Sequence, residues 1–415
     1  MRARRLAAPW VIPVLAPPIR DGAMLFDDLG RITVLGRDAV DEVPAPPGVH
    51  AEYFPNAVLL PGLVNAHTHL ELTGLGPLPD EPDFPSWIRK LRALKSERTE
   101  EQFRAAAERG VRDCWAAGVT TIADTGDTGA VARALHRLGG RGLVFQEVFG
   151  PHPDQCEESL DGLKAAIARL KQYASPNGVR LGVSPHAPYT VSGPLYRAVA
   201  KWAREEEMPI ALHLAESRDE SLLLADVTGG FADAWTQRDI PAPGPLGMSP
   251  VSWVDCHMGL DFDTLCIHAV RVDAADIALM AARKVTVAHC PLSNRAHAHG
   301  DAPLAAMLAA GIEVGVGTDS VLSVGTLDLI AEARTARRIA GVSAARALEL
   351  ITHEAAVAIG YDDVAGSLRA GGLADVAAIS LSGEMDDPIE DILTGQGTVL
   401  ATFVGGREVY RRGNG

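Results

Sequence analysis

The stretch that decides the fold is residues 61–71, PGLVNAHTHLE. It starts as an apolar, strand-like run and ends in the pattern His67-Thr68-His69. Because alternate side chains of a strand point to the same face, both imidazoles can face one cavity and clamp a metal ion. A pair of unrelated polar residues at a strand end is the other interpretation of this pattern when it stands alone.

Seven more apolar runs, each bounded by Gly or Pro, follow along the chain and alternate with Ala-, Arg-, Glu- and Leu-rich stretches of helical periodicity. The eight strand-like runs are residues 58–70, 118–126, 142–150, 179–188, 209–217, 264–270, 284–294 and 312–320. The helix candidates are residues 101–117, 130–138, 161–173, 193–207, 274–283 and 303–310. This alternation predicts an α/β protein with a (β/α)8 TIM barrel, although an open doubly wound sheet also alternates.

The positions of polar residues separate these two folds. Histidines and one aspartate stand at the C-terminal ends of the strand runs, where barrel enzymes place their chemistry. These residues are His67, His69, His186, His213, His268, His289 and Asp319. An open sheet would gather its ligands at one switch point instead. We therefore expect a barrel over residues 58–361.

Residues 1–57 and 362–415 have a different pattern, with short extended pieces such as GRITVLG and ADVAAISL separated by Gly, Pro and Asp. We expect the two termini to form one small β-sandwich-like domain. Residues 221–263 are long for a βα connection and contain PAPGPLGMSP, which favours a lid or specificity insert.

Composition narrows the class of function. The net charge of −15 argues against binding to nucleic acid or to an anionic membrane and favours a small-molecule substrate. The five cysteines are scattered, without a CxxC pair, as expected for reduced thiols in a cytoplasmic protein. Prolines interrupt the apolar run near the N-terminus, which we interpret as mature protein rather than a signal peptide, and later apolar runs are too short to span a bilayer.

Two further motifs join the histidine pair. In HLAES, His213 closes a strand and Glu216 follows, so the histidine can bind metal while the carboxylate faces substrate. In GTDS, Asp319 ends the last strand run, where it can bind metal and accept a proton from water. Each has a purely structural alternative, since Glu is favoured at a helix start and Asp as an N-cap. Finding all three motifs at one predicted rim favours a metal-dependent active site.

Together with His268 in IHAV, the motifs PGLVNAHTHLE, SPHAPYTVS, HLAES, AHCPLSN, GVGTDS and GGLADVAAI resemble the amidohydrolase superfamily, in particular its cytosine deaminase and chlorohydrolase-like branch. The resemblance covers nearly the whole chain and implies a barrel with a composite β-sandwich. Members with two metals usually carry a carboxylated lysine at the end of strand four. That strand ends here in SPHAP, so we expect one metal and a His186 free to contact substrate, with a structural histidine as the alternative.

The resemblance implies an aminohydrolase acting on a cyclic amidine. We expect its metal ligands to be His67, His69, His213 and Asp319. These donors suit Zn²⁺, with Fe²⁺ as the alternative. Asp319 and His268 would orient and deprotonate the attacking water, while Glu216 protonates the neighbouring ring nitrogen. His268 would also stabilise the developing oxygen charge.

The segment FPSWIRKLRALK, from Phe84 to Lys95, looks like the F-x-x-W-[IL] signature of aminodeoxyfutalosine deaminases, which act in the futalosine route to menaquinone. We therefore favour 6-aminodeoxyfutalosine as substrate. Phe84, Trp87 and Ile88 also have the spacing of a helix packed on a core, which explains them equally well. The predicted substrate contacts are His186, Trp87, Tyr189, Arg218, His289, Asn294 and Ser320.

Several alternatives stay open. The substrate could instead be adenosine, 5′-methylthioadenosine, S-adenosylhomocysteine or a chlorotriazine, and a non-catalytic barrel with an assembly role is the alternative outside enzymes. His297 and His299 form a second His-x-His, but in a loop without a strand to fix them, so we do not expect a metal there. Homodimers are common among such barrels, and the sequence indicates no interface.

Overall fold

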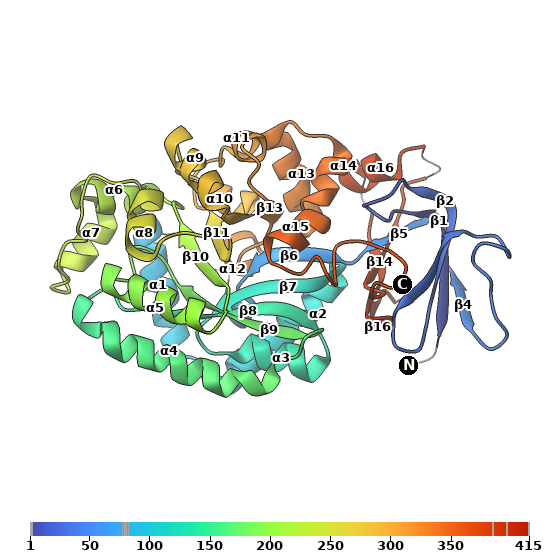
Figure 1. The fold of residues 1–415 in the computed structure, drawn as a ribbon, viewed down its shortest axis with the longest axis horizontal. Coiled ribbons are helices and arrows are strands. Elements are labelled where there is room, and N and C mark those ends of the chain that lie inside the picture. The colour runs from blue at the N-terminus through green and yellow to red at the C-terminus, as the bar shows by residue number, and fades with distance from the viewer. Residues whose placement is uncertain are drawn as a thin grey trace.

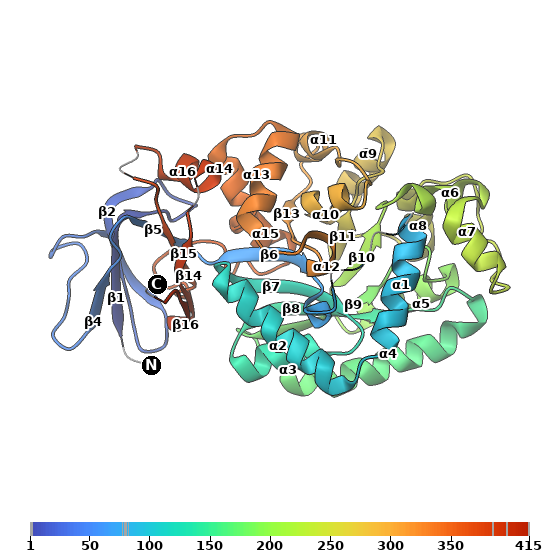
Figure 2. The same cartoon turned by 180° about the vertical axis from the view of Figure 1, so that it is seen from behind.

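The computed structural model describes residues 3–76, 78, 81, 83–383, 386–395 and 397–413. It has two parts: a barrel of strands with helices outside it, and a second sheet at one end (Figure 1; Figure 2 from behind). The first and the last strand of the described chain belong to the second sheet.

The barrel consists of eight parallel strands in sequence order. They are β6 (Leu63–Thr68), β7 (Val119–Gly126), β8 (Arg141–Val148), β9 (Val179–Pro185), β10 (Ile210–Leu214), β11 (Thr264–His268), β12 (Thr286–His289) and β13 (Val314–Val316). A parallel bridge between Thr68 and Asp319 joins the last strand to the first, and the Asp319 N–H donates to the His67 carbonyl at 3.0 Å. The predicted TIM barrel is confirmed.

Glycines allow this closure. A Cβ on Gly317 would lie 2.6 Å from the His67 nitrogen, and a Cβ on Gly315 would lie 2.9 Å from the Ala66 Cβ. Both distances are shorter than real Cβ contacts, so only glycine lets β13 approach β6 this closely. The GVGTDS motif therefore shapes the barrel as well as supplying Asp319.

The helices cover the outside of the barrel, and their starts and ends follow local sequence signals. The Thr99 and Gln102 side chains form a capping box at the start of α2, and α3 ends at Gly139 in the left-handed conformation. α3 and α9 have the predicted bounds, whereas α4 begins at Cys156, earlier than predicted, because the turn Pro153–Gln155 leads directly into it. The helices are α1 (Phe84–Ser96), α2 (Glu100–Ala116), α3 (Ala130–Leu138), α4 (Cys156–Leu170), α5 (Gly193–Glu205), α6 (Arg218–Asp226), α7 (Gly229–Thr236), α8 (Pro250–Met258), α9 (Ala274–Arg283), α10 (Pro291–Ala296), α11 (Leu304–Ala309), α12 (Val321–Val324), α13 (Leu329–Ala340), α14 (Ala344–Glu349), α15 (His353–Ala358) and α16 (Pro388–Thr394).

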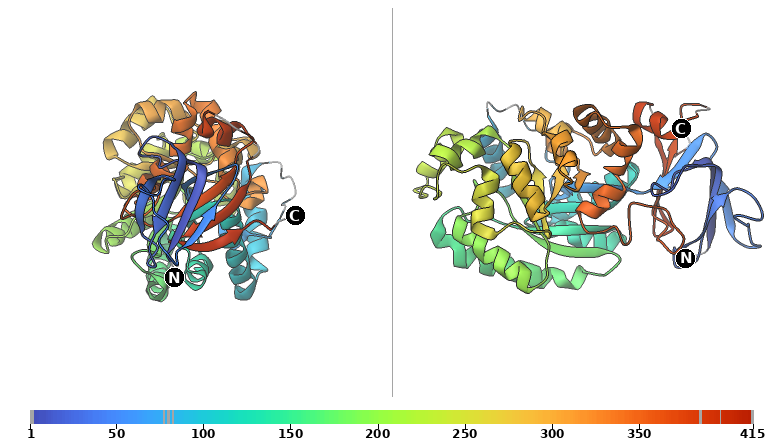
Figure 3. Two further views of the ribbon diagram at one scale, coloured as in Figure 1. Left: turned by 90° about the vertical axis from the view of Figure 1, so that its right-hand side faces the viewer. Right: turned by 45° about the horizontal axis from the view of Figure 1, so that its top comes forward.

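The second sheet contains strands from both termini and confirms the composite domain. Its strands are β1 (Arg4–Val11), β2 (Ile19–Phe26), β3 (Ile32–Arg37), β4 (His50–Tyr53), β5 (Ala57–Pro61), β14 (Val376–Ser380), β15 (Val399–Val404) and β16 (Arg407–Arg411). Their order is β16-β15-β14-β5-β1-β2-β3, with β4 paired to β1. Leu6, Phe26 and Phe403 belong to a hydrophobic core of its own. Figure 3 shows strands from the beginning and the end of the chain lying together in this part of the molecule.

The predicted strand over residues 58–70 is in fact two strands. β5 belongs to the terminal sheet and β6 to the barrel, and the chain passes between them at Gly62. The Gly62 N–H donates to the Asp375 carbonyl at 2.9 Å, and a Cβ on Gly62 would lie 2.2 Å from the Thr120 side chain. The terminal sheet therefore extends to Pro61, beyond the predicted limit at residue 57.

Residues 221–263 form most of α6 together with α7 and α8. The Phe231 ring of α7 stacks on Tyr189 with a centroid separation of 4.0 Å, and the Trp235 indole donates to the Tyr189 carbonyl at 2.9 Å. The segment therefore packs against the loop that follows β9. Within the part of the chain that the structure describes, there is no helix long and apolar enough to cross a membrane.

Candidate active site

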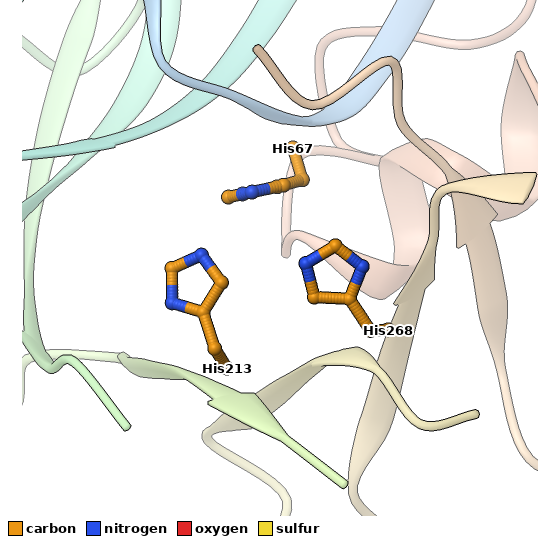
Figure 4. A group of neighbouring side chains, drawn as sticks. All are labelled: His67, His213 and His268. Atoms are coloured by element: carbon orange, nitrogen blue, oxygen red, sulfur yellow. The ribbon is translucent and has the colours of Figure 1, made fainter. Parts of the chain in front are cut away.

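The ends of β6 and β10 and the segment that follows β13 bring the predicted metal ligands together. The His69 Nε2 lies 3.3 Å from the His213 Nε2, and the Asp319 Oδ1 lies 3.4 Å from the His67 Nε2 and 3.5 Å from the His69 Nε2. Figure 4 shows how His67, His213 and His268 face a common space from three separate strands. The three imidazoles and one carboxylate predicted from the sequence therefore converge at one rim of the barrel.

The protonation of these imidazoles shows that the cluster suits a cation. The His69 Nδ1 lies 2.9 Å from the Thr125 carbonyl oxygen, and the His213 Nδ1 lies 3.1 Å from the His186 carbonyl oxygen. Because a carbonyl only accepts, each Nδ1 carries the proton and the two Nε2 lone pairs face each other. The His67 Nε2 is buried and has no hydrogen-bond partner among the described residues. Lone pairs converging in a buried site fit a divalent cation with nitrogen and oxygen ligands.

Asp319 is held as a carboxylate. Burial raises its pKa, but the nearby His67, whose Nε2 lies 3.4 Å from the Asp319 Oδ1, with further contributions from His268 and His69, outweighs burial and keeps the pKa well below its usual range. The Ser293 hydroxyl donates to its Oδ2 at 2.5 Å. The backbone of Asp319 has φ +57 and that of His268 has φ +74, which are left-handed conformations that concentrate at functional sites.

Glu216 lies beside the metal ligands and is almost fully buried. Its Oε1 is 3.6 Å from the His268 Nε2 and 3.4 Å from the His299 Nε2. Burial raises the pKa of Glu216, but His268 and His299 outweigh burial and hold the pKa at about 2. Glu216 is therefore ionised at neutral pH and has to take up a proton before it can donate one.

Asn294, in the segment after β12, orients the His268 ring. Its Nδ1 lies 2.9 Å from the Asn294 Oδ1, so Nδ1 carries the proton and Nε2 faces Glu216. The structure thus gives Asn294 a contact with His268 rather than a place on the cavity wall.

A cavity of about 460 Å³ opens above this cluster. Of the sequence-predicted residues, those that line it are His69, Trp87, His186, Tyr189, His213, Glu216, His268, Asp319 and Ser320. His67 lies deeper, below the wall. The other three predicted substrate contacts are not brought to the cavity: Arg218 is exposed at the start of α6, whereas His289 and Asn294 are buried behind the lining.

One wall of the cavity is a single face of α1. Its lining residues follow helical spacing and are Phe84, Trp87, Ile88, Leu91, Arg92, Lys95 and Ser96. The Lys95 ammonium pairs with Glu71 at 2.9 Å and with Asp127 at 2.7 Å, which fixes the C-terminal end of the helix to the barrel. The apolar stripe of this segment therefore faces the cavity.

Further charged residues that were not predicted from the sequence also line the cavity, among them Glu147, Arg92 and Arg238. Glu147, near the end of β8, has an Oε1 without a hydrogen-bond partner, and one of its oxygens lies within 4.8 Å of ring nitrogens of His69 and His213. Arg92 and Arg238 form no ion pair within 4.0 Å among the residues that the structure describes. A carboxylate at the end of a strand run, as in FQEVFG, was the available signal for Glu147.

Most of the chain matches a known protein family. The model of the amidohydrolase family matches residues 58–409. The chain belongs to the amidohydrolase family. A 5-methylthioadenosine/S-adenosylhomocysteine deaminase of Haloarcula marismortui is 32% identical over 89% of this chain and 80% of its own, and one of Moorella thermoacetica is 32% identical over 89% and 84%. This confirms the predicted family, and with it a hydrolase of carbon–nitrogen bonds.

Solved structures of similar proteins share the whole amidohydrolase fold of this chain. A zinc-bound adenosine deaminase from Xanthomonas campestris superposes with a TM-score of 0.85 at 25% identity, covering 97% of this chain and 92% of that one. The aminofutalosine deaminase of Helicobacter pylori has a TM-score of 0.84 at 21% identity, with 98% and 100% covered. The atrazine chlorohydrolase TrzN of Arthrobacter aurescens has a TM-score of 0.82 at 21% identity, with 97% and 94% covered.

Proposed function

We propose that this chain is a metal-dependent deaminase that hydrolyses the exocyclic amine of an adenine nucleoside bearing a carboxylate-containing extension, with 6-aminodeoxyfutalosine as the favoured substrate. The names of the similar proteins, which are methylthioadenosine/S-adenosylhomocysteine and adenosine deaminases, support a purine nucleoside as the substrate class. The ionised acids, the imidazole cluster and the cavity above them support hydrolysis at a bound ring.

His67, His69, His213 and Asp319 would hold one divalent cation, for which Zn²⁺ is favoured and Fe²⁺ is the alternative. The zinc described for the Xanthomonas relative supports this choice. When bound, such a cation lowers the pKa of water and stabilises negative charge on oxygen.

The first proton transfer falls to Glu216. Hydrolysis of an amidine carbon needs one proton on the neighbouring ring nitrogen and a second on the departing amine. Because Glu216 starts as a carboxylate, it takes its proton from the attacking water and gives it to the ring nitrogen. Protonation there makes the ring carbon more electrophilic, and the oxygen of water adds to it.

Asp319 and His268 supply the second transfer. The remaining proton of the added oxygen passes to the exocyclic amine, and the carbon–nitrogen bond then breaks to release ammonia and leave a carbonyl group. The Asp319 carboxylate and the His268 imidazole both line the cavity, and we assign this proton transfer to them. His186, whose pKa burial lowers to about 3, stays neutral and offers its imidazole to the substrate ring.

The observation that carries the substrate assignment is the face of α1. Phe84, Trp87 and Ile88 form an apolar wall, and Arg92 continues the same face one turn further on. Arg238 lines the cavity from the segment that follows α7, and burial together with the charge of Arg92 lowers its pKa. The two positive charges are therefore close enough for one anion to meet both. An aromatic wall beside two arginines favours an aromatic carboxylate such as the benzoate of 6-aminodeoxyfutalosine.

S-adenosylhomocysteine is the second candidate. Relatives at 32% identity carry this substrate in their names, and its amino acid carboxylate also meets the two arginines. 5′-Methylthioadenosine has no carboxylate and would leave them unused.

The test is an ammonia-release assay with purified, metal-loaded enzyme across 6-aminodeoxyfutalosine, S-adenosylhomocysteine, 5′-methylthioadenosine and adenosine. We expect the highest kcat/KM for 6-aminodeoxyfutalosine and a lower one for both substrates that lack a carboxylate. Equal or better turnover of S-adenosylhomocysteine would transfer the assignment to the second candidate. A preference for methylthioadenosine would refute the role of the arginines.

A further inference from the structure

The second His-x-His of the chain, His297 and His299, places two imidazoles with a ring-centroid separation of 5.5 Å. Among the described residues, the side-chain groups able to share a metal ion include neither of them. The His297 Nε2 lies 2.9 Å from the Ser323 hydroxyl and its ring lines the cavity. The two imidazoles therefore have different polar neighbours, although both rings pack against Phe84.

His299 faces the proposed proton carrier from behind. Its Nε2 lies 3.4 Å from the Glu216 Oε1, its side chain is 4% exposed, and it is absent from the cavity wall. The backbone N–H of His299 donates to the backbone carbonyl of Asn294 at 2.8 Å, and the His299 ring meets Phe84 edge-on with a centroid separation of 4.6 Å. Backbone and ring are thus both held, and the imidazole cannot reach a substrate in the cavity.

The segment around α10 places two imidazoles on one oxygen of Glu216. The Asn294 side chain orients His268 and its backbone carbonyl anchors His299, while both Nε2 atoms approach the Glu216 Oε1. Because the His268 Nδ1 donates to the Asn294 Oδ1, the His299 Nε2 is the neighbouring ring nitrogen able to donate an N–H to this oxygen.

The His299 Nε2 is buried and has no hydrogen-bond partner among the described residues, and the Glu216 Oε1 lies 3.4 Å from it. We propose that His299 is a positioning residue that donates its Nε2–H to the Glu216 Oε1 during turnover and so directs the other carboxylate oxygen, Oε2, toward the substrate ring nitrogen. The inference rests on the proposed deaminase function. A hydrogen bond to one oxygen removes the rotation by which the carboxylate would otherwise exchange its two oxygens. Proton transfer to the ring needs that orientation, whereas substrate binding does not.

Phe84 connects this contact with the substrate wall. Its ring lines the cavity, stacks with Trp87 at a centroid separation of 5.9 Å and packs against His299. The residue that packs against substrate therefore also fixes the plane of the imidazole that orients Glu216.

The experiment compares His299→Ala and His299→Gln with the wild type, in metal-loaded full-length protein, using 6-aminodeoxyfutalosine and S-adenosylhomocysteine. We expect His299→Ala to lower kcat by about 10- to 100-fold, the usual effect of removing such a partner, with KM, metal content and Tm unchanged. His299→Gln keeps an N–H donor and should restore most of kcat. His50→Gln makes the same chemical change at an exposed residue of β4 and should behave as wild type.

A double variant separates positioning from a structural role. If His299 acts through Glu216, adding His299→Ala to Glu216→Gln causes no further loss of kcat, because the group that it orients is gone. The proposal would be overturned if His299→Ala kept full kcat, or if the losses of kcat in the two single variants added up in the double variant. It would also be overturned if the loss of kcat in His299→Ala came with a loss of metal or a lower Tm. If the wild type releases no ammonia from any adenine nucleoside, the proposed function fails first and this inference fails with it.

Discussion

The ionised state of Glu216 is the residue-level feature on which the proposed chemistry depends. Its carboxylate is buried beside His268 and His299, and its pKa of about 2 makes it a proton acceptor before it is a donor. A glutamine at this position keeps the size of the side chain and removes the proton-carrying oxygen pair.

We therefore expect Glu216→Gln to lower kcat by about 10²- to 10⁴-fold, the range for losing a general acid or base, while metal content stays at the wild-type value. Steady-state kinetics and metal analysis of the same preparation measure both quantities. Glu157→Gln, an exposed residue of α4, is the matched control. Wild-type turnover in Glu216→Gln would remove Glu216 from the mechanism.

Glu147 gives a second prediction at this scale. Its Oε1 lacks a hydrogen-bond partner among the described residues, and the side chain lines the cavity beside His69 and His213. In a nucleoside site, the hydroxyls of the ribose are the donors that would satisfy this oxygen. We expect Glu147→Gln to raise KM by about tenfold for a ribonucleoside substrate, and less for its 2′,3′-dideoxy analogue. An equal change for the two substrates, measured side by side, would argue against contact with the hydroxyls.

The same residues show how far the sequence predicts a site. His67, His69, His213 and Asp319 were predictable because each ends a strand run, and parallel strands of a barrel bring those ends to one rim. Contacts across the rim were not predictable, because they depend on which neighbour each side chain meets after folding. Asn294 meets His268 instead of the cavity, and His299 meets Glu216 although its loop carries no periodic pattern.

At the scale of elements, α1 forms the wall that we assign to substrate recognition. Its apolar residues face the cavity, and Lys95 ties its end to Glu71 and Asp127. Arg92 sits on the same face without an ion-pair partner among the described residues, so a carboxylate of the substrate is the charge that it can meet.

We predict that Arg92→Gln lowers kcat/KM about tenfold or more for substrates with a carboxylate, since hydrogen bonds to charged groups contribute about 1.5–3 kcal/mol. The same variant should leave kcat/KM for 5′-methylthioadenosine unchanged. Arg89→Gln, one turn earlier in α1 and off the cavity wall, is the control. A similar loss for all substrates would indicate a structural role for Arg92.

The periodicity of α1 predicted the helix but left two interpretations of its apolar stripe, packing on a core or lining a pocket. The structure places this face on the cavity. The split of residues 58–70 into β5 and β6 was likewise hidden, because the apolar run is continuous and the break depends on Gly62 approaching Thr120, a residue of another strand.

At the scale of the whole molecule, one buried ion pair joins the barrel to the terminal sheet. The Arg141 Nε of β8 lies 3.0 Å from the Asp375 Oδ2, and both side chains are 4% exposed. The Gly405 N–H donates to the same carboxylate at 2.6 Å. Arg141 and Asp375 are 234 residues apart in the sequence. The alternation of strands and helices was therefore predictable from the sequence, whereas this ion pair was not.

Asp375→Ala should lower the free energy of unfolding by about 3–5 kcal/mol, because it leaves the Arg141 charge buried without a partner. Denaturant unfolding measures this change, and kcat of the folded variant should stay near the wild-type value. Glu52→Gln removes a more exposed pair with Arg411 and should cost at most about 1 kcal/mol. Equal, small effects of the two substitutions would show that Arg141 and Asp375 do not hold the two parts together.

The most direct measurement for the whole account is the fate of the oxygen in ¹⁸O-labelled water during turnover of 6-aminodeoxyfutalosine by metal-loaded enzyme. The proposed mechanism predicts one ammonia released for each substrate consumed and one ¹⁸O atom in the purine ring carbonyl of the product. In Glu216→Gln, both ammonia release and ¹⁸O incorporation should run at no more than about one hundredth of the wild-type rate. Intact adenine nucleosides after prolonged incubation, or a product that contains no label, would contradict it.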